Sequence, residues 1–460
     1  MFVIGSIFTR EMKIDLYKTE EFEDDVDVPI LYSHSSRGLT NNDSRGIDFV
    51  APGAAMITSF PQWHSKTDNL SIYQGTSIAA PCVTGSIACL LSALKANNIP
   101  YFPATIKLAL RNTAFLLAKS DKLGFGNGII QISDAFEYLK VLPKIFSTKN
   151  LIPKITLYEF EGNSLKEIKG KSGILWIKKG NEELSKKYCL KITAAKAAMD
   201  FQFSWKLKIL PEFNNFVKIS KLFTEDLISF KIDTNLLKFG SINYAEIHGS
   251  DAINPSYGTF FYIPITVIIP EPNNYPLKKE LNLKLQVPEH IFFLPPSNVS
   301  KCTVKLTALE ENAQTIFVQY ANEDGFTDDN SRPQQLKFNS DNLIQHLQIP
   351  VLSPEKIFQV SFYRYFPSKF QKSKILKFSL EINFEKSVVL QDNPALKHNN
   401  MNQYIIAYDV ELEEEGEFKD GESGLNGELY ESNGEEYFSD TEKNEEGFEF
   451  SNDYAEDPYF

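Results

Sequence analysis

The sequence predicts an α/β domain with a parallel sheet, followed by two antiparallel β-sandwich domains and a disordered acidic tail. Three observations support this fold class. Up to about residue 140, short apolar strands alternate with helical segments, as in α/β domains. From about 150 to 390, apolar residues recur at every second position, which is typical of half-buried strands. Residues 411–460 are strongly acidic.

The first domain is expected to span residues 1–145. Apolar runs at Phe2–Phe8 and Ile47–Ala51 indicate strands. Residues 77–96 place apolar side chains at helical spacing on a surface rich in Ala and Gly, so we expect a buried helix packed closely on a sheet. A second helix is expected to begin at Pro103, because proline is favoured in the first turn.

The two sandwich domains are expected at residues 150–270 and 275–392. Apolar residues alternate with polar ones in Phe201–Ile209 and in Leu376–Phe384. Ten or more such segments, separated by Pro, Asn, Gly and Ser, favour antiparallel sandwiches over a further α/β unit. The turn-rich segment Pro270–Asn274 is the expected boundary between the sandwiches.

The negative charge of the chain is concentrated at its end. The net charge is −13, and residues 411–460 contain 19 Asp and Glu against 2 Lys. Such a segment repels itself and buries little apolar surface, so residues 405–460 are expected to be disordered. Both a docking tail for basic partners and a solubilising tail are compatible with this composition.

The cysteine pattern indicates neither a disulfide framework nor a zinc site. The four cysteines are scattered along the chain: Cys82, Cys89, Cys189 and Cys302. We interpret them as reduced core residues in a cytoplasmic protein. The apolar start Met1–Phe8 is too short for a signal peptide, and the run Phe260–Ile269 is too short to span a membrane. No metal, cofactor, membrane or nucleic-acid partner is expected.

Two other features are more simply explained by structure than by a binding function. Basic pairs at Lys186–Lys187 and Lys278–Lys279 lie on β-rich segments, where such pairs are usually solvated. The segment Glu323–Asn330 is acidic enough to suggest calcium, but its spacing does not match an EF-hand loop, so a polar turn is favoured.

The chemistry is expected at Ser77, within the segment Gly75–Pro81. At the start of a helix, free backbone N–H groups and the helix dipole favour the negative charge that develops in acyl transfer. Gly75 leaves room for a substrate carbonyl, and Gly75 and Thr76 are the expected substrate-binding residues. A Gly-Thr-Ser tripeptide taken alone is more often a plain helix cap.

The wider context of Ser77 resembles the nucleophile region of the subtilases, whose signature is Gly-Thr-Ser-x-[Ala/Ser]-x-Pro. The segment Tyr73–Asn98 carries this resemblance, and Ser35–Gly38 and Ile47–Gly53 look like two family blocks that precede it. Within the subtilases, Gly126–Gln131 and Tyr244–Val267 are similar to the tripeptidyl-peptidase II branch. The resemblance extends to about residue 390 and weakens after about 140.

The catalytic Asp and His of the family are expected to be absent from this chain. Subtilases order their triad as Asp, His and Ser. The 76 residues before Ser77 contain no Asp-[Ser/Thr]-Gly, no His-Gly-Thr and no Asn before Asn41 that could complete an oxyanion hole. His34 and His64 lie in polar stretches and are poor candidates for the base. Ile78, Leu39 and Ala54 also depart from the family pattern, conservatively.

The missing partners predict a chain that is nearly inert alone, because loss of the base costs on the order of 10⁶ in turnover. We therefore expect a chain cut short at its N-terminus or one completed by a separate partner. The missing segment would also supply strands of the parallel sheet, so the first domain is expected to be the C-terminal half of a subtilisin-like domain.

The resemblance implies a cytoplasmic serine exopeptidase that releases tripeptides from peptide N-termini, with Ser77 as nucleophile and peptides as substrates. It also implies a homo-oligomer, an immunoglobulin-like sandwich at 150–270 and a galactose-binding-like sandwich at 275–392. The alternative is a non-catalytic pseudoenzyme that acts as an assembly or binding module.

Overall fold

The structure is a computed structural model of the 460-residue chain. It describes residues 1–386, except for 17–28, 33–34, 59–69, 118–119, 148–151, 180–181, 194–202, 213–214, 221–226, 285–286, 312–313, 323–332, 352 and 365–374. The described residues all belong to one compact unit, Met1–Val410. The predicted acidic tail and the acidic segment Glu323–Asn330 lie outside the described residues.

The N-terminal region is built around a small mixed sheet with the strand order β2-β1-β3. Strand β1 (Ile4–Phe8) runs parallel to β3 (Phe49–Pro52) and antiparallel to the two-residue strand β2 (Ile30–Leu31). A hairpin of β4 (Ala54–Thr58) and β5 (Leu70–Gln74) follows. The parallel pair agrees with the expected α/β region, and Ile7, Phe8, Phe49 and Val50 are fully buried in it.

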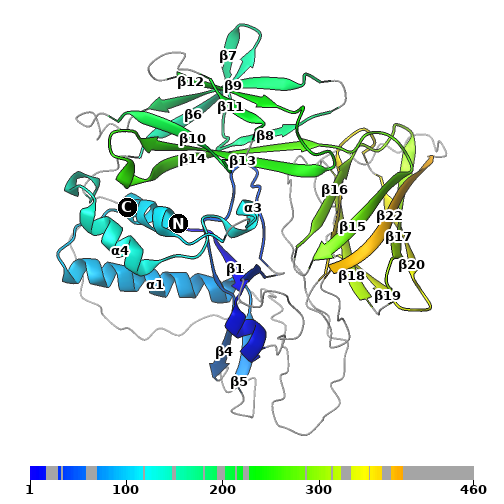
Figure 1. Cartoon of the computed structure of the whole chain (residues 1–460), viewed down its shortest axis with the longest axis horizontal. Coiled ribbons are helices and arrows are strands. Elements are labelled where there is room, and N and C mark those ends of the chain that lie inside the picture. The colour runs from blue at the N-terminus through cyan, green and yellow to red at the C-terminus, as the bar shows by residue number, and fades with distance from the viewer. Residues whose placement is uncertain are drawn as a thin grey trace, which may run out of the picture. The chain divides into compact units, whose positions relative to one another are not determined.

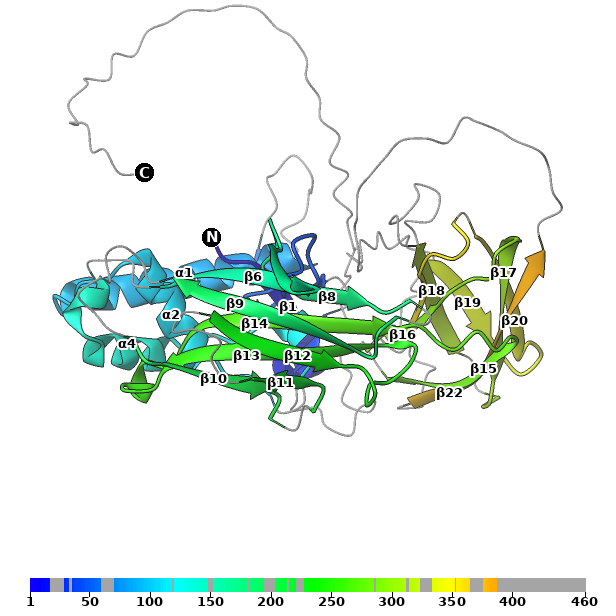
Figure 2. The ribbon, with the colours of Figure 1, turned by 90° about the horizontal axis from the view of Figure 1, so that it is seen from above.

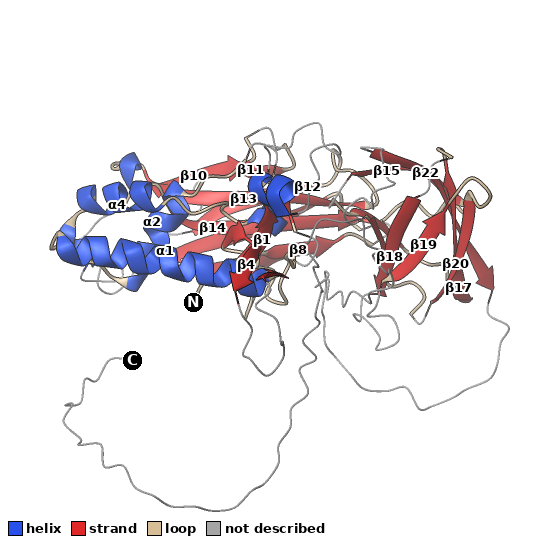
Figure 3. Cartoon of the chain, turned by 90° about the horizontal axis from the view of Figure 1, so that it is seen from below, coloured by secondary structure: helices blue, strands red, loops and turns tan. Residues whose placement is uncertain are grey.

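Every α-helix in the described part of the chain lies between residues 76 and 141. Figure 3 draws the helices in blue and labels α1, α2 and α4. Both helices predicted here, the one over 77–96 and the one beginning at Pro103, are confirmed within a residue or two. The α-helices are α1 (Thr76–Ala96), α2 (Pro103–Thr113), α3 (Lys122–Phe125) and α4 (Ile132–Val141). Short helical turns lie at Met12–Leu16, Lys144–Ser147 and Pro255–Tyr257.

Helix α1 is not the buried helix that its sequence predicts. Its buried residues lie on one face, at spacings of four and seven: Ala79, Val83, Leu90 and Leu94. The opposite face is exposed and carries Cys82 and Cys89, so the interpretation of these two cysteines as core residues is wrong. The apolar composition of α1 exceeds what the small sheet covers. Among the described helices, α1 is the one that is long and apolar enough to cross a membrane. The core helices of soluble proteins also meet this criterion of length and composition.

A first pair of sheets follows α4 in the chain (Figure 1). One sheet has the order β10-β13-β14-β8, formed by Trp205–Leu210, Ser241–Asp251, Thr259–Ile269 and Ile174–Ile177. The other has the order β11-β12-β9-β6-β7, formed by Val217–Ile219, Leu227–Asp233, Ser185–Thr193, Lys154–Glu161 and Ser164–Glu167. Their facing side chains form one apolar core that includes Trp176, Phe230 and Ile265.

The expectation of purely antiparallel sandwiches is wrong at one strand. Strands β13 and β14 form a long antiparallel pair (Figure 2), but β8 joins β14 in parallel, with Ile174 opposite Ile265. The alternation of apolar residues that predicts a strand is the same for both orientations, so this pattern could not distinguish them.

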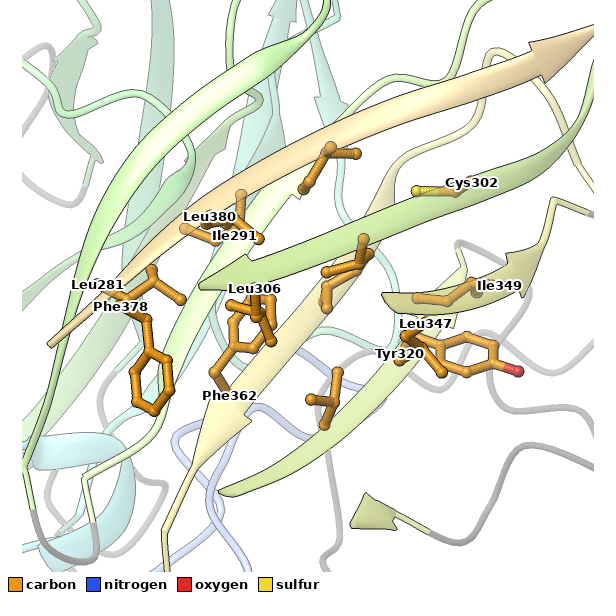
Figure 4. Packing of buried hydrophobic residues seen from close by; sticks show 14 of the residues in the cluster. Leu281, Ile291, Cys302, Leu306, Tyr320, Leu347, Ile349, Phe362, Phe378 and Leu380 are labelled. Atoms are coloured by element: carbon orange, nitrogen blue, oxygen red, sulfur yellow. The ribbon is translucent and has the colours of Figure 1, made fainter. Parts of the chain in front are cut away.

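A second pair of sheets is antiparallel throughout its described strands. One sheet has the order β15-β22-β17-β20, formed by Leu277–Lys284, Ile375–Lys386, Val299–Ala308 and Ile344–Pro350. The other has the order β16-β21-β18-β19, formed by Glu289–Phe293, Phe358–Tyr363, Gln314–Asn322 and Gln334–Phe338. Figure 4 shows side chains from both sheets, such as Leu306 and Phe362, packed in a shared core.

Candidate active site at the start of helix α1

Ser77 lies in the first turn of α1, and its side chain is exposed. Gly75 is the N-cap residue, and no side chain caps this helix end. The first amides of a helix have no acceptor within the helix. Among the described residues, the Thr76 and Ser77 amides donate no hydrogen bond, so they remain able to bind an anionic oxygen. The predicted address of the hydroxyl, at the positive end of a helix, agrees with this geometry.

Gly75 adopts a backbone conformation that only glycine tolerates well. Its φ is +131°, a region that residues with a Cβ atom rarely adopt. The Gly75 amide donates to the carbonyl oxygen of Gly53 at 2.7 Å. This bond ties the turn before Ser77 to the segment that leaves β3.

Gly53 is equally constrained, but by close packing. A Cβ atom at Gly53 would lie 1.5 Å from the Ser6 Oγ atom and 2.8 Å from the Ser6 Cβ atom. The Gly53 amide donates to the Ile7 carbonyl oxygen at 3.1 Å. The parallel strands β1 and β3 therefore hold Gly53, and Gly53 holds Gly75.

The segment Ser35–Gly38 is hydrogen-bonded to β1 and to α3. The Ser35 hydroxyl accepts a hydrogen bond from the Ser6 amide at 2.9 Å, and both residues are buried. The Gly38 amide donates to the Leu123 carbonyl oxygen at 2.9 Å. Sequence analysis identified Ser35–Gly38 only as a family block, and the structure gives it a structural role at β1.

A histidine or carboxylate partner for Ser77 is not found among the residues that the structure describes. No hydrogen bond joins Ser77 to either kind of side chain in this part of the chain. His34 and His64 lie outside the described residues, so their predicted unsuitability as the base stays a prediction. Within the described ranges, no group of three or more His, Cys, Asp or Glu side chains is placed to hold a metal ion.

A buried charged cluster that the sequence did not predict is centred on Glu246 of β13. The Oε1 atom accepts hydrogen bonds from Arg45 Nη1 at 3.0 Å and from the Tyr244 hydroxyl at 2.7 Å. The Oε2 atom lies 2.6 Å from His248 Nε2 and 3.3 Å from Lys122 Nζ. The side chains of Arg45 and Glu246 are almost completely excluded from solvent. Arg45 and Lys122 belong to residues 1–145, the serine-bearing region, so the cluster joins that region to the first pair of sheets.

The electrostatics of the cluster keep Glu246 ionised. Burial alone would raise the pKa of Glu246, but the His248 hydrogen bond and the charges of Arg45 and Lys122 outweigh it, so the pKa falls. Burial lowers the pKa of His248, partly offset by Glu246. Because an ionised carboxylate only accepts hydrogen bonds, the His248 Nε2 atom carries a proton and donates it to Glu246 Oε2.

One signal in the sequence could have revealed the cluster. Tyr244, Glu246 and His248 alternate with the apolar residues Ala245 and Ile247, so the three share one face of β13. Lys, Glu, Arg and Asp are rarely fully buried unless they are paired. A carboxylate in a core strand therefore indicates a distant cationic partner, although its identity needs the fold.

Comparisons with known proteins agree with this geometry. Residues 27–129 match the subtilase family, Peptidase_S8. Tripeptidyl-peptidase 2 of Caenorhabditis elegans is 30% identical over 284 residues, covering 58% of this chain and 20% of that protein. Tripeptidyl-peptidase 2 of Arabidopsis thaliana is 30% identical over 253 residues, covering 52% and 18%.

A crystal structure of tripeptidyl peptidase 2 (TPP II) shares the fold, with a TM-score of 0.57 and 20% identity, over 83% of this chain and 30% of that one. The chain spans about a fifth of the length of the two curated relatives. Residues 27–129, which include Ser77, are therefore similar to the subtilase family, and the chain as a whole is similar to part of tripeptidyl-peptidase 2.

Proposed function

We propose that Ser77 is the acylated nucleophile of a tripeptidyl-peptidase 2-like serine peptidase that releases tripeptides from free peptide N-termini. The observation that carries the proposal is the exposed hydroxyl of Ser77 in the uncapped first turn of α1, beside the parallel pair β1 and β3. The likeness to tripeptidyl-peptidase 2 supports the proposed substrate class.

The chemistry follows from this address. The Ser77 Oγ atom attacks the scissile carbonyl carbon, while the Ser77 amide donates to the oxygen that becomes negative. Gly75 has no side chain, so the substrate carbonyl can approach the turn, with Thr76 beside it. The proton from Ser77 passes to an imidazole that the stretch before Ser77 does not provide in a recognisable motif. The imidazole gives this proton to the leaving amine as the scissile C–N bond breaks, and water then hydrolyses the ester that joins the tripeptide to Ser77. We propose that an Asp and a His from outside this sequence complete the triad, and that the chain alone is inactive.

A second candidate function is a non-catalytic assembly or binding module. Two observations favour it: the stretch before Ser77 has neither catalytic motif, and the two pairs of sheets are well packed regardless of any chemistry at Ser77. This alternative keeps the sandwiches and assigns no reaction to the serine.

A chimaera separates these functions. The part of the C. elegans tripeptidyl-peptidase 2 that precedes its matched region is fused to this chain, and release of tripeptides from an N-terminally free peptide is followed by mass spectrometry. We expect release by the chimaera, a loss of about 10⁴-fold or more in Ser77→Ala, and no change in Ser92→Ala, an exposed serine of the same helix. A folded chimaera whose Ser77→Ala variant is as active as its parent would exclude Ser77 as nucleophile, and an inactive folded chimaera would favour the binding module.

We further propose that the protein acts in the cytoplasm as a homo-oligomer. Its four cysteines are all free, as in a reducing compartment. Size-exclusion chromatography with light scattering tests the oligomer, and a mass equal to one chain would contradict it. The immunoglobulin-like and galactose-binding-like identities of the sandwiches and the disorder of the tail stay predictions.

A further inference from the structure

We infer that Glu246 is a positioning residue: it is a buried carboxylate of the first pair of sheets that fixes β3 and, through it, the turn that presents Ser77. The inference rests on the proposed function, because the importance of that turn depends on Ser77 being the nucleophile. It assigns a role to the first pair of sheets at the candidate site.

The first step links Glu246 to the start of β3. Arg45 donates from Nη1 to Glu246 and from Nε to the Ile47 carbonyl oxygen at 3.2 Å. The Arg45 guanidinium carbon also lies 4.3 Å from the centre of the Tyr262 ring in β14. One buried side chain thus connects the first pair of sheets to the backbone two residues before β3.

The second step links Glu246 to the loop that follows α3 and is hydrogen-bonded to β3. Lys122, in α3, reaches Glu246 Oε2 at 3.3 Å. The loop that follows α3 is bonded to β3: the Val50 amide donates to the Gly128 carbonyl oxygen at 3.0 Å, and Asn127 donates to the Asp48 carbonyl oxygen at 2.9 Å. Glu246 therefore restrains both segments that flank β3.

The third step links β3 to Ser77. Strand β3 ends at Pro52, and the next residue, Gly53, holds the Gly75 amide at 2.7 Å, two residues before Ser77. Because Gly53 packs against Ser6 without room for a Cβ atom, a shift of β3 displaces Gly53 and the turn at Gly75 together.

Loss of the carboxylate charge should weaken the restraint that Glu246 places on β3 and on the turn at Gly75. In Glu246→Gln, Arg45 and Lys122 keep their charges, and the buried guanidinium of Arg45 loses its counter-charge. Leaving one member of a buried ion pair is strongly destabilising, so the Arg45 segment is expected to move towards water. A matched control is Glu271→Gln, because Glu271 pairs with Lys279 at 2.8 Å and none of its described hydrogen bonds reaches Arg45, Lys122 or β3.

The test is hydrogen exchange on the full chain, read at the Gly53 and Gly75 amides and, as an internal reference, at amides of the β18–β21 pair. We expect Glu246→Gln to lower the protection of Gly53 and Gly75 at least tenfold while the reference amides keep theirs, and Glu271→Gln to leave Gly53 and Gly75 unchanged. Unchanged protection at Gly53 and Gly75 would overturn the inference. So would an equal loss at every amide, because that pattern indicates only general destabilisation.

A spectroscopic readout and a milder variant complete the design. The NMR titration of ¹³C-labelled His248 should move to lower pH in Glu246→Gln, because the carboxylate that favours the imidazolium is lost. If Glu246→Gln fails to fold, Lys122→Met removes the partly exposed cation and should show the same local pattern to a smaller extent. Exchange at these amides does not depend on the chemistry of Ser77, so an inactive serine and a failed inference give different results.

Discussion

The serine-bearing region and the second pair of sheets solve the burial of apolar surface in different ways. The second pair of sheets closes its own core, since strands from both sheets contribute fully buried side chains such as Val304, Val360 and Phe378. In the serine-bearing region, a small sheet covers one face of α1 and leaves the other exposed. A region that completes its own core can fold alone, whereas a region with an incomplete core needs contacts with another part of the chain.

The first pair of sheets provides these contacts for the serine-bearing region. Apart from the Glu246 cluster, helices α2 and α4 bind the turn before β14 and the first two residues of β14. Arg111 donates to the Phe260 carbonyl oxygen at 2.7 Å, Asn112 accepts from the Thr259 amide at 2.9 Å, and the Tyr138 hydroxyl donates to the Tyr257 carbonyl oxygen at 2.6 Å. These bonds satisfy backbone groups that would otherwise be costly to bury.

The largest expected effect separates the two regions outright. Expressed alone, residues 275–392 should unfold cooperatively on heating, because their core is complete. Residues 1–145 expressed alone should show neither a cooperative transition nor dispersed amide resonances, because they lack Glu246 and the turn before β14. Circular dichroism and NMR spectra of both fragments check this, and a cooperatively folded 1–145 fragment would break the comparison.

A core truncation in the second pair of sheets should be the next largest effect. Phe362 is fully buried and packs in the core drawn in Figure 4. Phe362→Ala should lower the free energy of unfolding by about 3–5 kcal/mol, through lost burial and a cavity. Urea denaturation of this fragment measures it, and a loss below about 1 kcal/mol would show that this core is loosely packed.

The two faces of α1 should respond differently to truncation. Leu94 is fully buried, so Leu94→Ala should cost about 2–5 kcal/mol in the full chain. Cys89 is exposed on the other face, and Cys89→Ala should change stability by no more than about 0.5 kcal/mol. Equal losses in the two variants would mean that the exposed face is covered in solution, for example by a partner.

The smallest expected effect is a dependence on pH in the second pair of sheets. Burial and the nearby charge of Arg37 lower the pKa of His290 to about 3. A folded-state pKa below the unfolded value means that stability is fully present above about pH 6.5 and is lost as pH falls towards 3. The loss is at most about 1.4 kcal/mol per pH unit.

Urea denaturation between pH 7 and pH 5 measures this slope. His290→Gln should flatten it, while the exposed His346 offers a matched control, in which His346→Gln should keep the slope. If both variants keep the slope of the parent, His290 does not carry the acid sensitivity.

Much of the fold could be predicted from local pattern. The helix at Thr76–Ala96, the strand at Thr259–Ile269 and the position of Ser77 follow from periodicity and from one motif. Two features could not be predicted, because they depend on residues far apart in the chain. The parallel pairing of β8 is invisible to alternation, and the partnership of Glu246 with Arg45 spans 201 residues.

The exposure of Cys82 and Cys89 was also not predictable from local pattern. Apolar and small residues predicted a buried helix, but the burial of a helix depends on how much surface its neighbours offer. Cys189 and Cys302, on strands with complete neighbours, are buried as predicted, and burial raises the pKa of the Cys302 thiol to about 12.

Peptide-mapping mass spectrometry after treatment with a fluorophosphonate tests the central claim most directly. In the chimaera, which supplies the Asp and His of the proposed triad, we expect one covalent adduct on the peptide that contains Ser77, and we expect no adduct on that peptide in the chain alone. An adduct on a different serine of the active chimaera, with Ser77 unmodified, would contradict the account.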